Sequence, residues 1–389
     1  MKEHPIFTPK GLCIAARGWP GSAGLPWVID GPSCSSTPTG LCPWNRGRSR
    51  WSNPFRVKEQ SSNRVTQGSV AATQPWAVFR HPFGVKVNMS RRDFCRATVA
   101  TLAAAPLARA AEPFRLRYVL ASCMYGTMGL STILAHLRET GAEVIDLWPR
   151  PHGDQREQVE EMGYERFAEL LHEHGVTLGV STRYDLGPER AHEEIPFLKK
   201  LGGSVLVTGS GGPKGLMGDE LKSAVRKLVD RLGPAAAAAR EAGVTLAIEN
   251  HASSLLDSPD SMRWFAQFSA GTPHLGLAFA PHHLPQDASF QASLIEQLGP
   301  AVKFFYAQQL GKGSKQAMPK ADELLQMPGR GPLDFAPVVA ALRKINFQGY
   351  AEIFMHPFPR GIPILDTAEL VTQEINRSRA YLDKCIKNG

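Results

Sequence analysis

The sequence predicts an α/β fold, a single (β/α)8 barrel of the TIM type. From residue 115 onward, eight short apolar or β-branched segments alternate with longer segments of helical periodicity. Alternating β and α units build parallel sheets, and eight repeats in about 275 residues match the size of such a barrel. A doubly wound open sheet is the alternative, but no Gly-x-Gly-x-x-Gly follows the first strand.

The elements of the barrel are assigned from hydrophobic periodicity and from the residues that end helices. The apolar segments predict strands over 116–122, 143–147, 177–181, 204–208, 245–250, 274–279, 302–307 and 350–354. Helical spacing predicts helices over 155–174, 216–242, 258–268, 335–345 and 366–385. Ser258 is expected to cap its helix. Glycines are expected to end helices before strands at positions 141, 175, 202, 243 and 349.

The first 110 residues differ in composition from the barrel. Residues 1–88 are rich in Pro, Gly, Ser, Arg and Trp and show no structural period, which predicts disorder. Residues 89–110 combine the pair Arg91-Arg92, an apolar segment over 97–108 and an Ala-x-Ala site at 108–110, which resembles a twin-arginine signal peptide. We therefore expect translation to start at Met89, with 1–88 as upstream sequence translated by mistake or a disordered extension. The barrel, 111–389, is then exported or periplasmic.

Charge and cysteine content narrow the function classes. The chain has a net charge of +8, but residues 1–110 hold 15 Lys and Arg against 4 Asp and Glu. Residues 111–389 are therefore mildly acidic, which argues against a nucleic-acid partner. No apolar stretch reaches the ~18 residues of a membrane span, so stable membrane insertion is not expected. Of the six cysteines, only Cys123 and Cys385 follow the signal. Whether these two form a single disulfide bond is left open by the sequence. The oligomeric state is also left open.

Polar residues at the carboxyl ends of barrel strands are the candidates for function. The fifth strand ends in Glu249-Asn250-His251, and a buried Glu there needs a partner or a metal. A salt-bridged structural Glu is the alternative reading. The sixth strand is followed by His282 and His283, which are versatile ligands.

The last two strands add further candidates. Tyr306 and Gln308 end the seventh strand and suit sugar hydroxyls, although simple strand-end polarity explains them equally well. In the eighth strand, a period of two places Glu352 and His356 on one face, which is expected to point inward.

Earlier strands contribute Trp148, which either stacks on a sugar or packs against a helix, and Arg183 as a candidate substrate ligand. Asp146 and Tyr184 stand beside them.

Two segments resemble the sugar phosphate isomerase/epimerase family of xylose-isomerase-like barrels. They are Val244-Thr-Leu-Ala-Ile-Glu-Asn-His251 and Pro328-Gly-Arg-Gly-Pro-Leu-Asp-Phe335, and the resemblance spans roughly 115–385. Asp334 is placed where a side-chain cap opens a helix.

The resemblance also implies a metal site, from which this sequence departs. The family holds one divalent metal with Glu, Asp, His and Glu after strands five to eight. Here Glu249 matches, whereas Ala280, Tyr306 and Phe354 stand at the other positions, with Glu352 one pleat before Phe354. A rebuilt site would use Glu249, one of His282 and His283, and Glu352, with Gln308 as a weak fourth ligand. Mn, Mg, Zn or Co would suit it, and a metal-free barrel is equally open.

The function implied is proton abstraction next to a carbonyl on a sugar or keto-sugar, as in isomerisation, epimerisation or elimination. Glu249 and Glu352 are the candidate catalytic groups. The candidate substrate ligands are Trp148, Arg183, His251, His283, Tyr306, Gln308 and His356. The partner expected is a small-molecule carbohydrate. A carbohydrate-binding barrel without catalysis is the alternative, and a nuclease is disfavoured by the acidic charge of 111–389.

Overall fold

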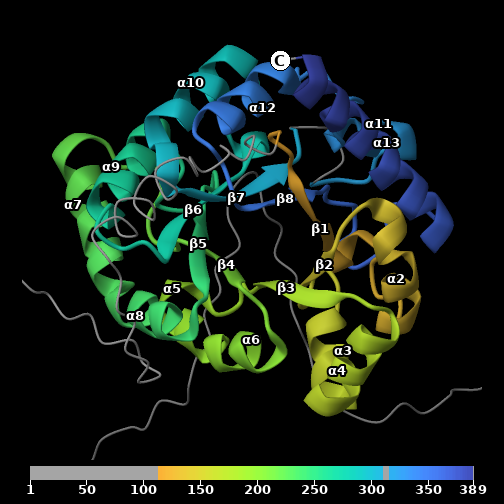
Figure 1. Ribbon diagram of the computed structural model, residues 1–389. Helices are drawn as coiled ribbons and strands as arrows, with labels where there is room; N and C mark the ends of the chain where they lie inside the picture. Colours follow the sequence, from red (N-terminus) through yellow and green to blue (C-terminus); the bar gives the residue numbers. More distant parts are fainter. Residues whose placement is uncertain (1–112, 310–314, 389) are drawn as a thin grey trace, which may run out of the picture. The chain divides into compact units, whose positions relative to one another are not determined.

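The computed structural model describes residues 113–309 and 315–388 and confirms the predicted barrel. Eight parallel strands close in the order β1 to β8, and Figure 1 shows the helices forming a ring around them. The strands are β1 Arg117–Ala121, β2 Val144–Leu147, β3 Thr177–Thr182, β4 Val205–Gly209, β5 Thr245–Glu249, β6 Leu275–Phe279, β7 Val302–Ala307 and β8 Tyr350–Ile353. Segments 1–88 and 89–110, including the expected signal peptide, lie outside the described residues.

The strands form where the sequence is apolar on both faces, because a barrel strand packs against the interior on one side and helices on the other. Every residue of β2, β6 and β8 is buried. The ladder closes where β1 pairs with β8, with Arg117 opposite Tyr350. In β7 and β8, Tyr306 stands opposite Glu352, so the register brings a phenol and a carboxyl side by side.

Most helices of the described residues cover the strands with an apolar face. The helices are α2 Leu130–Leu137, α3 Gln155–Met162, α4 Tyr164–Glu173, α5 Gly187–Arg190, α6 Ile195–Leu201, α7 Gly218–Arg231, α8 Gly233–Ala242, α9 Pro259–Ser269, α10 Ala288–Leu298, α11 Lys320–Glu323, α12 Phe335–Lys344 and α13 Ala368–Asn388. The predicted caps are confirmed: Ser258 forms a capping box on α9, and Asp334 accepts from Ala336 N in α12.

Two predicted helices are each divided into two. The segment 155–174 breaks at Gly163, whose φ of 83° lies outside the helical region. The segment 216–242 breaks around Leu232, because Pro234 in the first turn of α8 has no N–H to continue the preceding helix. In both places the apolar period runs through the break, so periodicity alone joins the two helices.

The glycines predicted to end helices divide into two kinds. Those at 141, 175, 202 and 243 have positive φ, as helix ends require. Gly349 does not: α12 is followed by Asn346 in the left-handed region, with φ 52°. A Cβ at Gly349 would overlap the backbone of Lys303, so this glycine permits close approach of the chain to β7. The expectation of a helix end at Gly349 was wrong.

Two further expectations concern the membrane and the cysteines. Within the described residues, no helix combines the length and apolar character that crossing a bilayer requires. Cys123 and Cys385 are both buried and free, so the disulfide left open by the sequence is absent between them.

Candidate active site

The carboxyl ends of β5 and β6 bring one carboxyl and two imidazole groups together. Donor atoms of Glu249, His282 and His283 all lie within 4.8 Å of one another. Glu249 is the last residue of β5, and both histidines belong to the 3-10 turn η4, Pro281–His283, directly after β6. The Nε2 atom of His283 lies 3.8 Å from Glu249 Oε1, beyond hydrogen-bond distance.

Asn250 fixes the position of this turn relative to β5. Its side chain donates to Ala280 O (3.0 Å) and accepts from Ala280 N (2.7 Å), so the ends of β5 and β6 are joined by two reciprocal hydrogen bonds. From α10, Gln291 donates to Pro281 O and Pro285 O and holds the other side of the turn. The histidine backbone is thus held by groups that do not occupy the imidazole nitrogens.

The imidazoles are neutral and lack protein partners. Both ring nitrogens of His282 and Nε2 of His283 are buried without a hydrogen bond among the described residues. Burial, reinforced by neighbouring histidines, holds the pKa of His282 well below its usual range and lowers the pKa of His283 to about 3. Metal ligation requires neutral imidazole, and buried polar atoms without a partner are costly. Two imidazoles and a carboxylate therefore fit a divalent transition metal.

Burial also acts on Glu249, which is 4 % exposed. It raises the pKa of this carboxyl to about 8, opposed by a hydrogen bond from Tyr184. The Oη atoms of Tyr184 and Tyr306 lie 3.1 Å apart. A hydrogen-bonded chain of two phenols therefore runs from Glu249 towards β7 and holds its carboxyl in place.

A second carboxyl pair, Asp146 and Glu352, lies fully buried in the barrel. Asp146 Oδ2 accepts from Thr182 Oγ1 (2.6 Å), and Glu352 Oε1 accepts from Trp148 Nε1 (3.3 Å). The remaining oxygens, Asp146 Oδ1 and Glu352 Oε2, find no donor among the other described groups. The negative charge of Asp146 adds to the effect of burial on Glu352, which favours a protonated carboxyl in this pair. Burial raises the pKa of Asp146 to about 7 and that of Glu352 well above its usual range.

Several residues predicted from the sequence to bind metal or substrate lie in environments that the sequence did not indicate. Glu352 is not one of the three clustered donors, which instead include both histidines. Trp148 is fully buried and stacked on Phe354, with ring centroids 4.8 Å apart. His251 contacts His283 at a centroid distance of 4.0 Å and accepts from Ser253 N through Nδ1.

The other predicted ligands lie around the cluster or outside it. His356 is 6.1 Å from His282, again between ring centroids. Gln308 donates to Gln326, which leaves its carbonyl oxygen without a partner. Arg183 is engaged by Asp185 and Glu194, so little donor capacity is left for a substrate.

Sequence reasoning missed two residues of this end of the barrel. His152 lies 5.2 Å from both Trp148 and His356 between ring centroids. Arg360 lies close enough to His152, His282 and His356 for its charge to lower the pKa of each, after burial. Both belong to Pro-rich loops after strands, so the strand-end rule could have found them had it been extended by a few residues.

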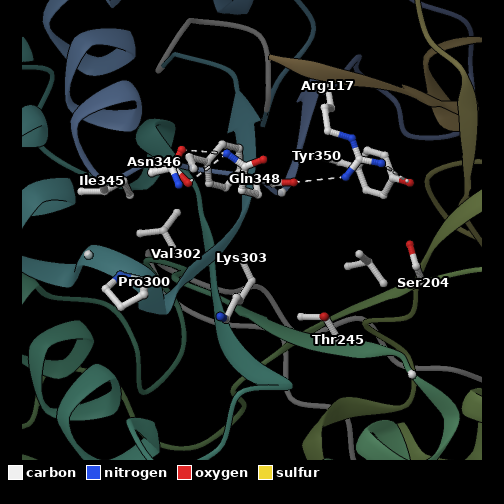
Figure 2. Close-up of a pocket in the computed structure, with 15 residues that line it drawn as sticks. Arg117, Ser204, Thr245, Pro300, Val302, Lys303, Ile345, Asn346, Gln348 and Tyr350 are labelled. Carbon is white, nitrogen blue, oxygen red and sulfur yellow. Dashed lines mark hydrogen bonds between the residues drawn. The ribbon is translucent and has the colours of Figure 1, made fainter. Parts of the chain in front are cut away.

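A cavity of about 440 Å³ lies at the opposite end of the barrel. Figure 2 shows Arg117, Thr245, Val302 and Tyr350 around it, and these residues begin β1, β5, β7 and β8. The described residues that line it include no carboxylic acid, histidine or cysteine. This cavity therefore lacks the side chains that acid–base catalysis or metal binding requires. We assign the candidate active site to the carboxyl ends of the strands.

Comparison with known proteins identifies the family of the fold. Residues 134–380 match the family model described as a xylose isomerase-like TIM barrel. The curated proteins include no match. Similar solved structures are an L-ribulose 3-epimerase (16% identity, TM-score 0.51, covering 70% of this chain and 95% of that one) and the IolI protein with a bound zinc atom (15%, 0.51, 70% and 99%). A third is the 3-keto-D-glucoside 4-epimerase YcjR from E. coli (14%, 0.51, 68% and 100%). At these identities the similarity shows the fold.

Proposed function

The chain belongs to the xylose isomerase-like TIM barrel family, and from this premise we propose that it is a sugar isomerase or epimerase. The reaction class is proton abstraction next to a carbonyl on a sugar or keto-sugar. The observation that carries the proposal is the cluster of Glu249, His282 and His283 at the carboxyl ends of β5 and β6. Similarity to an L-ribulose 3-epimerase and to a 3-keto-D-glucoside 4-epimerase supports the same class. Export through the twin-arginine signal remains part of the proposal.

Glu249 is the proposed base. A general base works best when its pKa lies near the working pH, and without a bound metal burial raises the pKa of this carboxyl to about 8. Its hydrogen bond from Tyr184, itself joined to Tyr306, keeps the carboxyl in one orientation while the proton is taken up. The partly exposed ring of His283 lies beside it as a hydrogen bonder for the substrate oxygen.

Glu352 is the proposed second acid–base group. Burial and the neighbouring Asp146 raise its pKa well above the usual range, so this pair favours a carboxyl that holds a removable proton at neutral pH. β5 and β8 stand three strands apart around the barrel, so the two carboxyls approach its centre from different directions. An epimerase needs two groups placed in this way, because a proton leaves one face of a carbon and returns to the other.

We further propose that Glu249, His282 and His283 hold one divalent metal. Such a metal, when bound, supplies polarisation of a carbonyl oxygen without proton transfer. Two imidazoles and one carboxylate favour Zn or Co over Mg, which prefers oxygen ligands. The solved IolI structure with bound zinc supports a zinc-type ion in this fold.

Elemental analysis tests the metal assignment. Protein produced with Mn, Mg, Zn and Co supplied should retain about one metal ion per chain, which we expect to be Zn or Co. Glu249→Ala and His282→Ala should each lose it, whereas His172→Ala, on the exposed face of α4, should keep it. Retention by both site variants would place the metal elsewhere.

Solvent deuterium exchange tests the reaction. Keto- and aldo-sugars are incubated in D₂O with metal-loaded protein, and loss of the proton next to the carbonyl is followed by ¹H NMR. Compared at equal metal occupancy, Glu249→Gln should slow exchange by roughly 10²–10⁴-fold, the typical contribution of a general base. Lys303→Met, at the cavity of Figure 2, is the control and should exchange at the wild-type rate. Full exchange in Glu249→Gln would refute the assignment, and sugar binding without exchange would favour a binding barrel.

A further inference from the structure

Arg360 lies in the loop after β8, close enough to His282 to lower its pKa, and this loop is fixed to a neighbouring loop. The segment after β8 forms an antiparallel bridge between Pro363 and Tyr125, and Ile364 N donates to Met124 O (3.0 Å). Gly361, with φ 82°, packs its backbone against Pro151 of the loop after β2. Contacts with the loops after β1 and β2 thus position the backbone next to Arg360.

The guanidinium of Arg360 is half-buried and has no acidic partner among the described residues. Its one hydrogen bond there runs from Nη1 to Pro357 O (2.7 Å). A guanidinium carries five N–H donors, so most of its donors remain available. Burial lowers the pKa of Arg360, with no carboxylate opposing the effect. The positive charge is therefore desolvated without compensation from the protein, which is unfavourable.

Two other arginines at this end of the barrel, unlike Arg360, are paired with carboxylates. Arg156 binds Glu194 through Nε (2.7 Å) and Nη2 (3.1 Å). Arg183 binds the same carboxylate and also Asp185. Buried charges are normally paired in this way. Arg360 departs from that pattern within the same end of the same barrel, beside His282.

The surroundings of Arg360 are also positive or neutral. The titratable groups that interact electrostatically with Arg360 include His152, His282 and His356, together with the buried thiol of Cys123. Lys315 lies close enough to His251 and His283 for its charge to lower their pKa values, after burial. Two cations, Arg360 and Lys315, thus act on opposite ends of the histidine group.

We propose that Arg360 binds an anionic group of the substrate, a carboxylate or a phosphate. The substrate class is then an acidic sugar or sugar derivative, not a neutral sugar. This inference rests on the proposed function, because it takes the histidine and Glu249 cluster as the place where the sugar carbonyl reacts. A planar fork with free donors matches both anions, and bidentate pairing with either is strong.

Equilibrium binding tests the inference without turnover. Three probes share one ring and differ at carbon 6: D-glucuronate, D-glucose 6-phosphate and D-glucose. Ligand-observed NMR titration of the full chain should show tighter binding of one or both anionic probes, by roughly 10-fold or more, the usual effect of a charge-assisted hydrogen bond. A preference for the uronate identifies a carboxylate, and a preference for the sugar phosphate identifies a phosphate.

Variants assign the preference to Arg360. Arg360→Gln should abolish it and leave the affinity for D-glucose within about 2-fold, because a neutral ring makes no use of the charge. Arg360→Lys should restore part of it. The control, Arg150→Gln, changes an exposed arginine of the loop after β2 and should keep the full preference. Equal binding of all three probes by the wild type, or an anion preference that survives in Arg360→Gln, would overturn the inference.

Deuterium exchange separates this inference from the proposed function. If the anion preference depends on Arg360 but no anionic probe exchanges its proton, the binding inference stands and the proposed reaction fails. If sugars exchange through Glu249 with no anion preference, the proposed reaction stands and this inference fails.

Discussion

Two groups of buried carboxylates in this barrel are stabilised in opposite ways. Outside the strands, Glu194 accepts from Arg156, from Arg183 Nη1 (2.6 Å) and from Ser181 Oγ (2.7 Å). Inside, Asp146 and Glu352 receive one hydroxyl and one indole donor and no cation among the described residues. The outer carboxylate has its countercharges within the protein, whereas the inner pair has none among the described residues, and burial raises its pKa values. Burial alone therefore does not distinguish a structural carboxylate from a functional one, but the presence of a countercharge does.

The largest expected effect is on the outer group. Glu194→Gln leaves two arginines around a neutral amide, and breaking such a buried pair costs roughly 3–5 kcal/mol in free energy of unfolding. Urea denaturation checks this value. The neighbouring Glu193→Gln, whose carboxylate is exposed and paired with Arg190, should cost less than about 1 kcal/mol. If Glu194→Gln lowers the free energy of unfolding only slightly, the outer carboxylate is not stabilised by its arginines as proposed.

In the inner group, Asp146→Asn should raise the free energy of unfolding relative to wild type, whereas Glu194→Gln in the outer group should lower it. Burial raises the pKa of Asp146 to about 7 in the folded protein from its ordinary value of 3.8, so the folded chain keeps a proton that the unfolded chain releases. The contribution of Asp146 to stability therefore falls as pH rises from about 4 to 7, by up to ~1.4 kcal/mol per pH unit, and is constant above that range.

Asparagine does not titrate, so Asp146→Asn should gain stability relative to wild type across this window and keep the gain at pH 8. Urea midpoints at pH 5, 6, 7 and 8 in the presence of a chelator test it. The exposed Asp260→Asn serves as the control and should differ from wild type by the same small amount at every pH. A difference between Asp146→Asn and wild type that does not vary with pH would show that Asp146 is not proton-bound.

The smallest effect comes from two consecutive residues of β3 that face the two groups. Ser181 donates to Glu194 outside the barrel, and Thr182 donates to Asp146 inside. Ser181→Ala should cost about 1 kcal/mol, because the arginines remain on Glu194. Thr182→Val should cost more at pH 8 than at pH 5, since the ionised Asp146 loses its donor. If the loss of stability depends on pH equally in both variants, the proposed difference between the outer and inner carboxylates is wrong.

Most of the fold followed from the sequence because barrel strands are apolar on both faces. The predicted strands match the observed ones to within about one or two residues at each end, and β7 matches fully. The divisions at Gly163 and Leu232 did not follow, since the apolar period continues through them. Helix boundaries depend on local backbone geometry that a hydrophobic pattern does not record.

The site followed from the sequence only in part. The rule that polar strand ends carry function selected Glu249 and the histidine pair, which the structure brings together. The pairing of Asp146 with Glu352 was not predictable, because it depends on β1 lying between β2 and β8 when the barrel closes. The absence of a partner for Arg360 is likewise a property of the packed loops, and no local pattern reports it.

The bridge between Tyr125 and Pro363 has a consequence for synthesis of the chain on the ribosome. It joins the first loop of the barrel to the last, across 238 positions of sequence. Glu249 and both histidines leave the ribosome more than seventy residues before Arg360 does. A nascent chain therefore carries the candidate reactive groups well before it carries the anion-binding arginine. Recognition of an acidic ligand would thus mark a barrel that has been completely synthesised and closed.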